Sequence, residues 1–146
     1  FVRDLHSKFF IVRTSWVYGK YGANFVKTML KLGEERKELS VVSDQIGCPT
    51  YTLDLANAIL ELVNSEKYGI YHISNSGSCS WYELAKEIFK EAKMEIKVIP
   101  CTTAEFPRPA ARPAYSVLEH MSIELNQFSS IRSWREGLSA FIKSYI

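Results

Sequence analysis

The pattern of apolar and polar positions predicts several strands along the chain. The first is an unbroken apolar run that continues to a threonine, over Phe9–Thr14. Such a run is typical of a strand whose two faces are both buried in a parallel sheet. Shorter segments of the same kind occupy Leu39–Val42, Ile70–Ser74 and Ile96–Ile99. Polar or turn-forming residues bound each of them, as is usual for strands.

Helices are predicted from helical spacing and from capping residues. Asn24 is a suitable N-cap for a helix over Phe25–Arg36, and Thr52 can cap a helix whose apolar positions recur at helical spacing. Two capping boxes, Ser80–Glu83 and Ser133–Glu136, begin later helices, because in each the serine and glutamate side chains can satisfy each other's backbone N–H. Strands separated by helical patterns indicate an α/β chain.

The stretch over residues 100–113 is predicted to be an irregular surface loop. It holds four of the five prolines, and proline cannot donate a backbone hydrogen bond to a helix or a sheet. Arg108 and Arg112 lie on this stiffened loop, and arginine suits bidentate recognition of phosphate. The alternative is that both guanidinium groups are merely solvated. A short helix is expected afterwards, near Glu119–Asn126.

The composition indicates one soluble domain. The chain has 146 residues, of which 47% are hydrophobic, enough for a single buried core. Charges of both signs are interspersed and the net charge is only +2, so the dense basic face of a nucleic-acid-binding protein is absent. No apolar run approaches the roughly 20 residues that a membrane-spanning helix needs. We expect neither nucleic acid nor a membrane as a partner.

The cysteines Cys48, Cys79 and Cys101 are odd in number and widely spaced. This pattern offers no pair for zinc or for redox chemistry and fits reduced thiols. The histidines are isolated in the sequence, so no metal site is expected either. No basic and apolar signal segment opens the chain. The expected location is therefore cytoplasmic.

The end of the first strand is the leading candidate for a ligand site. Thr14, Ser15 and Trp16 follow the buried run, and ligands in open α/β sheets bind beyond the carboxyl ends of strands. A strand-end cap and a core tryptophan would explain the same residues. The loop Asp44–Thr50 is a second candidate, because turn chemistry alone does not require Gln45. A surface glutamine, however, needs no special explanation.

Tyr82 and Lys86 have the Tyr-x-x-x-Lys spacing with which many dehydrogenases transfer a proton. Here the pair lies in the first turn of a helix that a capping box begins, and no strand with a serine or threonine partner precedes it. We therefore assign no catalytic role to this pair. The sequence also lacks a Gly-x-Gly-x-x-Gly turn, so it brings no dinucleotide-binding fingerprint of its own.

Five motifs span nearly the whole chain. They are Val12–Gly19, Asn24–Val26, Asp44–Thr50 with Asp54–Ala56, Ser80–Lys86 and Arg112–Leu118. Together and in this order they resemble the dTDP-4-dehydrorhamnose reductases, a family of extended short-chain dehydrogenase/reductases. No single motif would identify the family, but their shared order does.

The resemblance implies an α/β fold, the C-terminal part of a Rossmann-type extended short-chain dehydrogenase/reductase. Phe9–Thr14 and Ile70–Ser74 would be two late strands of the Rossmann sheet. In this family the Gly-rich cofactor turn, the catalytic threonine or serine and the Tyr-x-x-x-Lys pair all precede the strand that corresponds to Phe9–Thr14. Residues 1–146 are therefore expected to be the substrate-binding C-terminal portion, without the N-terminal cofactor-binding portion and without catalytic residues.

The resemblance also implies roles for individual residues. Thr14 and Ser15 would bind the cofactor near its nicotinamide, and Trp16 would lie against the sugar ring, on which an indole face can stack. The residues expected near the nucleotide sugar or its diphosphate are Asn24, Gln45 and Arg112. Related sugar-nucleotide enzymes carry an arginine where this loop has Gly47, so neutralisation of the diphosphate would depend more on Arg112.

For the intact enzyme, the resemblance implies reduction of dTDP-4-dehydrorhamnose, a dTDP-4-keto-6-deoxy-sugar, to dTDP-L-rhamnose. Hydride would pass from NADPH or NADH to C4 of the sugar, while a tyrosine beside a lysine donates the proton. Neither cofactor is expected to bind tightly to this chain alone, and the chain alone is expected to be inactive. Without the missing N-terminal half, the first strand would have an open edge, which favours self-association.

Two alternatives stay open. Some members of the same family are regulatory subunits that bind a partner enzyme without catalysis, and the upstream Tyr-x-x-x-Lys pair would help to distinguish them. The chain could also come from another sugar-nucleotide enzyme, such as an epimerase. A comparison of stabilisation by dTDP, UDP and GDP would test that alternative.

Overall fold

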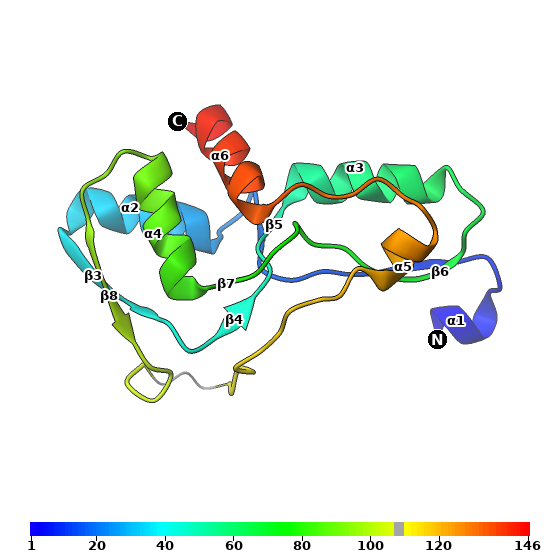
Figure 1. Cartoon of the computed structure of the whole chain (residues 1–146), viewed down its shortest axis with the longest axis horizontal. Helices are drawn as coiled ribbons and strands as arrows, with labels where there is room; N and C mark the ends of the chain where they lie inside the picture. The colour runs from blue at the N-terminus through cyan, green and yellow to red at the C-terminus, as the bar shows by residue number, and fades with distance from the viewer. Residues whose placement is uncertain (107–109) are drawn as a thin grey trace.

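The computed structural model describes residues 1–106 and 110–146. Its helices are α1 (Val2–Leu5), α2 (Phe25–Glu35), α3 (Thr52–Val63), α4 (Trp81–Glu91), α5 (Met121–Leu125) and α6 (Trp134–Tyr145). Its strands are β1 (Phe10–Arg13), β2 (Val17–Tyr18), β3 (Glu38–Val42), β4 (Ile46–Gly47), β5 (Thr50–Tyr51), β6 (Gly69–His72), β7 (Cys79–Ser80) and β8 (Lys97–Cys101). Figure 1 shows these elements in two groups, side by side along the long axis. No helix in this described part is long and apolar enough to span a membrane.

The first group is built around the pair of β1 and β6. The two strands are parallel, with Phe10 opposite Gly69 and Arg13 opposite His72. α3 contacts β1 and α5 contacts β6 (Figure 1). Their buried apolar side chains include Leu62, Tyr71, Ile73 and Ile123. The two strands that were predicted to belong to the Rossmann sheet are therefore paired with each other and parallel.

The second group is built around the pair of β3 and β8, which are parallel over their whole length. α4 contacts both strands of this pair and packs against α2 and α6. Buried apolar side chains from the three helices form the larger core, where removal of apolar surface from water stabilises the fold. They include Val26, Met29, Leu30, Leu84, Ile88, Phe89, Leu138 and Phe141.

Two ladders of two residues each lie between these groups (Figure 1). β2 is parallel to β5, with Val17 opposite Thr50, and β4 is antiparallel to β7, with Gly47 opposite Cys79. The segment Asp44–Thr50, predicted to be a loop, therefore contains β4 and the start of β5. Such short ladders show no alternation in the sequence, because the pairing partner rather than the local pattern defines them.

Both predicted capping boxes are present, at Ser80 with Glu83 and at Ser133 with Glu136. In each, the glutamate carboxylate accepts hydrogen bonds from the serine, and these bonds lower the pKa of that carboxyl group. The predicted cap of α2 is also confirmed, since Asn24 Oδ1 accepts from the backbone N–H of Lys27 at 3.0 Å. These three helix starts were visible in the sequence because both hydrogen-bonding partners are close neighbours.

Two predicted boundaries were wrong. Thr52 is the first residue of α3 rather than its cap, and Tyr51 occupies the N-cap position without a side-chain capping bond. β8 runs through Pro100 to Cys101, although residues 100–113 were predicted to be irregular. Pro100 lies opposite Val41 in a two-stranded sheet, where each strand has an open edge that tolerates a missing N–H.

Candidate functional site

A cavity of about 680 Å³ opens between α2, β3 and the segments that follow β3 and β8. Small-molecule sites usually have volumes of roughly 300–1,000 Å³ and combine apolar walls with a few polar groups. The walls include Phe25, Thr28, Leu32, Arg36, Glu38, Val41, Gln45, Trp81, Phe106 and Arg112. Two of the predicted substrate-binding residues, Gln45 and Arg112, therefore line one cavity.

Two aromatic side chains form one wall of the cavity, and a third packs behind them. Phe25 and Trp81 line the cavity directly, with their ring centroids 4.6 Å apart. Trp16 stacks on Trp81, with 3.5 Å between centroids and 10° between ring planes. One face of the Trp16 indole is therefore covered by protein. Sequence reasoning missed Trp81 as a site residue, because its place on the apolar face of α4 equally fits a core position.

The Trp16 indole also lies against Gly47. A Cβ at residue 47 would be 2.5 Å from Cε2 and 2.8 Å from Nε1 of Trp16, closer than real Cβ contacts come. Only glycine therefore fits beside the indole as it is placed. This explains in physical terms why residue 47 is a glycine here.

Thr14 and Ser15 follow β1 as predicted, but they do not line the cavity. Thr14 is exposed, and its Oγ1 donates to Thr50 Oγ1 at 3.3 Å. Ser15 Oγ donates to the Cys48 carbonyl at 2.8 Å. Both hydroxyls thus tie the end of β1 to the segment that leads into β5.

Asn24 stands at the start of α2, next to the cavity residue Phe25. Its Oδ1 caps the helix, and its Nδ2 donates to the Gly19 carbonyl at 2.9 Å. Both ends of the side-chain amide are therefore used inside the protein. Asn24 fixes the first turn of α2 relative to the preceding loop, and through it the position of Phe25.

Gln45 is buried, with 7% of its surface exposed, and its Nε2 donates to Thr103 Oγ1 at 3.0 Å. The neighbouring Asp44 accepts from the backbone N–H and the hydroxyl of the same threonine. These bonds hold the pKa of Asp44 below its usual value. The segment after β3 is therefore tied to the segment after β8, and Gln45 is held in place at the cavity wall.

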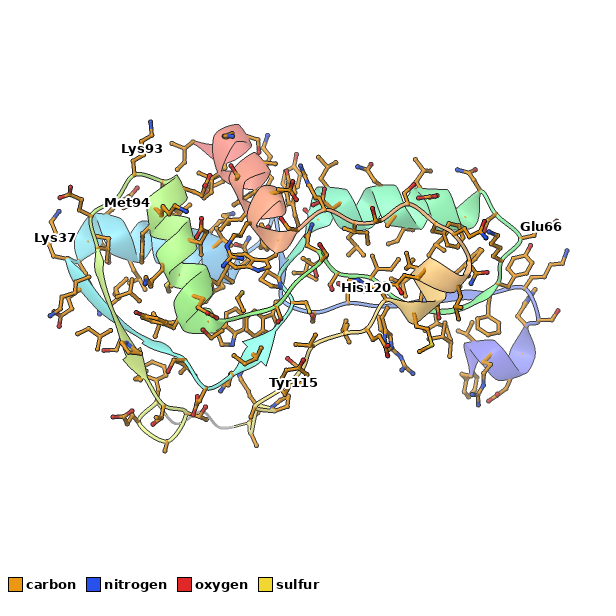
Figure 2. All side chains as sticks on the ribbon, in the orientation of Figure 1. Lys37, Glu66, Lys93, Met94, Tyr115 and His120 are labelled. Carbon is orange, nitrogen blue, oxygen red and sulfur yellow. The ribbon has the colours of Figure 1, made fainter. Side chains whose placement is uncertain are left out.

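Arg112 is exposed and also lines the cavity. Its segment is attached to β4, because the N–H of Ile46 donates to the Ala114 carbonyl and the N–H of Ser116 to the Ile46 carbonyl, each at 2.8 Å. Figure 2 shows Tyr115 on this segment, and Ile46 and Tyr115 form a parallel bridge. The other predicted arginine, Arg108, lies outside the described residues.

A polar network joins β5 and α3 to the segment that precedes α6. Arg132 forms a bidentate pair with Asp54, with distances of 2.7 and 3.0 Å. Asn75 Nδ2 donates to the same carboxylate at 2.7 Å, and Asn75 Oδ1 accepts from the backbone N–H of Tyr51 at 2.8 Å. Among the buried side-chain nitrogen and oxygen atoms of the described residues, only the Tyr18 hydroxyl has no partner, and its burial raises its pKa.

The described part of the chain has no group of three or more histidine, cysteine or acidic side chains that could hold a metal ion. For a nicotinamide cofactor, it offers the exposed Thr14 at the carboxyl end of β1. The sequence lacks the Gly-rich turn on which a dinucleotide pyrophosphate normally rests. The residues present therefore lack the element that would hold the phosphates of such a cofactor.

The similarity to known proteins extends over the whole chain. The family profile described as RmlD substrate binding domain matches residues 1–146. This chain belongs to the RmlD substrate binding domain family. This RmlD domain is 43% identical over 146 residues to the dTDP-4-dehydrorhamnose reductase of Aggregatibacter actinomycetemcomitans, covering 92% of this chain and 50% of that protein. It is 54% identical over 133 residues to the spore coat polysaccharide biosynthesis protein SpsK of Bacillus subtilis, covering 91% and 46%.

Solved structures agree with the fold of this RmlD domain. A dTDP-4-dehydrorhamnose reductase from Bacillus anthracis, in complex with NADP, matches with a TM-score of 0.94 and 55% identity, covering 99% of this chain and 51% of that one. A dTDP-glucose 4,6-dehydratase from the same organism, 14% identical with a TM-score of 0.73, shows the fold alone. The resemblance to the reductases and the Rossmann-type fold are confirmed. The chain spans about half the length of the curated relatives it matches.

Proposed function

We propose that this RmlD domain is the sugar-nucleotide-binding part of an NAD(P)H-dependent dTDP-4-dehydrorhamnose reductase, which forms dTDP-L-rhamnose. The cavity between Gln45, Arg112 and the aromatic pair of Phe25 and Trp81 carries this proposal. It offers a cation, an amide and apolar surface, which suit a diphosphate joined to a base and a deoxysugar. The names of the similar reductases indicate the choice of a dTDP-sugar.

In this proposal, the residues of the chain bind and orient the substrate. Arg112 pairs with the diphosphate, because a guanidinium matches phosphate oxygens in a bidentate geometry. Phe25 and Trp81 exclude water and pack against the flat or apolar parts of the ligand. Gln45 forms part of the same cavity wall. Asn24 caps α2 and so fixes the position of Phe25 in the first turn of that helix.

Thr14 and Ser15 mark the side of the site at which we propose that the nicotinamide binds. The bound NADPH or NADH supplies the hydride that reduces C4 of the sugar. Trp16 follows these two residues and stacks on Trp81, so it lies between the cofactor side and the cavity wall. The proton-donating tyrosine and the cofactor phosphate site are proposed to belong to the other half of the reductase.

A cytoplasmic location is proposed because the three cysteines are free thiols.

Binding of dTDP tests the proposed function. The chain is expected to bind dTDP more tightly than UDP, as measured by isothermal titration calorimetry. Arg112→Gln is expected to weaken dTDP binding about tenfold, because a hydrogen bond to a charged group contributes roughly 1.5–3 kcal/mol and 1.4 kcal/mol corresponds to tenfold. Arg3→Gln is the matched control, since Arg3 is exposed on α1, and it should bind dTDP like the unchanged chain.

Absence of dTDP binding would contradict the proposed function, and equal affinity for UDP and dTDP would favour a sugar-nucleotide protein of another kind. The same preparation is expected not to oxidise NADPH or NADH with dTDP-4-dehydrorhamnose, because it has no Gly-rich cofactor turn. Oxidation by this chain would show that it carries a complete active site.

We also propose that the other half of the reductase docks beside β1 and α3. Among the described strands, β1 pairs only with β6, and α3 exposes Leu53, Leu60 and Val63. Open strand edges and exposed apolar side chains favour association. The isolated chain is therefore expected to self-associate in sedimentation velocity runs, and Leu60→Glu should shift it toward monomer. Leu125→Glu, on the exposed side of α5, should have little effect, and a monomer at all concentrations would contradict this expectation.

A further inference from the structure

The backbone of Trp16 has an unusual conformation. Its φ is +45°, in the left-handed region that bulky residues seldom adopt. Such a conformation persists only where the surrounding structure holds it, and it is found most often at functional sites. The residues that hold Trp16 are therefore of interest in their own right.

Thr50 binds the peptide groups on both sides of Trp16. Its Oγ1 donates to the Ser15 carbonyl at 2.7 Å, and its backbone N–H donates to the Trp16 carbonyl at 3.1 Å. Its hydroxyl also accepts from Thr14 Oγ1 at 3.3 Å. Thr50 is only 1% exposed, so these bonds are shielded from water. One buried residue thus holds the peptide groups on both sides of Trp16, through its hydroxyl and its backbone N–H.

The indole of Trp16 is held as firmly as its backbone. Trp81 covers one face at a centroid distance of 3.5 Å, and Gly47 lies so close to the ring that a Cβ at residue 47 would collide with it. The pairing of Gly47 with Cys79 places β4 beside the strand from which α4 and Trp81 begin. Because Trp81 lines the cavity, a change in the position of Trp16 would move the cavity wall.

We propose that Thr50 is a positioning residue that sets Trp16, and through it Trp81, for contact with the sugar of the bound nucleotide. The inference rests on the proposed function. It goes further by assigning recognition of the sugar to the Thr50–Trp16–Trp81 arrangement, whereas Arg112 serves the diphosphate. The affinity for the sugar part can then change while the affinity for the nucleotide part stays the same.

The test compares dTDP-L-rhamnose with dTDP as ligands of Thr50→Val and Thr50→Ser. Valine keeps the shape and the backbone N–H but loses the hydroxyl, and serine keeps the hydroxyl. Thr50→Val is expected to bind dTDP-L-rhamnose about fivefold more weakly, as loss of a hydrogen bond of about 1 kcal/mol implies, with dTDP affinity unchanged. Thr50→Ser should restore the affinity for the sugar nucleotide. Ser65→Ala, which removes a hydroxyl bond to the Leu62 carbonyl elsewhere, is the control.

The outcomes separate this inference from the proposed function. If the unchanged chain binds neither ligand, the proposed function itself fails. If it binds both and Thr50→Val weakens both equally or neither, the positioning role is overturned. Should Thr50→Val not fold, Gly47→Ala provides the second test, because its methyl group displaces the Trp16 indole. Gly47→Ala is expected to lose affinity for dTDP-L-rhamnose selectively, and an unchanged affinity would overturn the inference.

Discussion

Replacing Phe141 with alanine is expected to lower the free energy of unfolding by about 4 kcal/mol, within the roughly 3–5 kcal/mol typical of a buried phenylalanine. Phe141 is 0% exposed on α6. Its ring centroid lies 5.5 Å from that of Tyr18 and 5.7 Å from that of Tyr51. Alanine would lose this aromatic packing and leave a cavity between α6 and the pair of β2 and β5. Urea denaturation followed by circular dichroism measures the change.

Phe1→Ala is the control for this measurement. Phe1 is 97% exposed, so its replacement should change the free energy of unfolding by less than about 0.5 kcal/mol. A loss below about 1 kcal/mol for Phe141→Ala, well under the usual range, would mean that α6 does not pack on β2 and β5 as described. It would also weaken the case for a rigid Trp16, because β5 begins with Thr50.

Replacing Asn75 with alanine is expected to lower the free energy of unfolding by about 3 kcal/mol, since each buried polar group left without a partner costs roughly 1–3 kcal/mol. Asn75 is fully buried, and its Oδ1 is the acceptor for the backbone N–H of Tyr51. Its Nδ2 donates hydrogen bonds to the Asp54 carboxylate and to the Arg132 carbonyl. Alanine would leave the N–H of Tyr51 unpaired and remove one donor from the Asp54 carboxylate. Urea denaturation again gives the difference.

Asn64→Ala provides a matched comparison at an exposed site. Asn64 Nδ2 donates to the Leu60 carbonyl at 2.8 Å, where water can replace it. Its loss should be within about 0.5 kcal/mol, as for most surface substitutions. If the two asparagine variants lost equal stability, the network that holds β5 would not depend on the burial of Asn75.

Much of the fold could be predicted because its signals are local. The helices that start after Ser80 and Ser133 were found from capping boxes whose two halves are three residues apart. β1 and β6 were found because each contains a run of apolar residues, although the structure leaves most of their residues only half-buried. β2, β4, β5 and β7 were missed, because each has two residues and pairs with a segment distant in the sequence.

The candidate site could be predicted only in part. Gln45 and Arg112 line the same cavity, as expected for residues that serve one ligand. Trp16 lies behind the wall, and the wall itself is formed by Trp81 with Phe25. Sequence spacing cannot separate a wall residue from a core residue on an amphipathic helix, because both lie on its apolar face. That distinction depends on how α2, α4 and β3 pack together.

The bridge between Ile46 and Tyr115 has a consequence for how this domain can diversify. Two main-chain hydrogen bonds set the spacing between the segments that carry Gln45 and Arg112, and the Ser116 hydroxyl adds a third bond to the same Ile46 carbonyl. The exposed Arg112, which lines the cavity, can therefore be exchanged without breaking the bridge, whereas the Gln45 side chain also ties its own segment to Thr103. A redesign of the proposed ligand preference should begin at Arg112 and leave the bridge between Ile46 and Tyr115 intact.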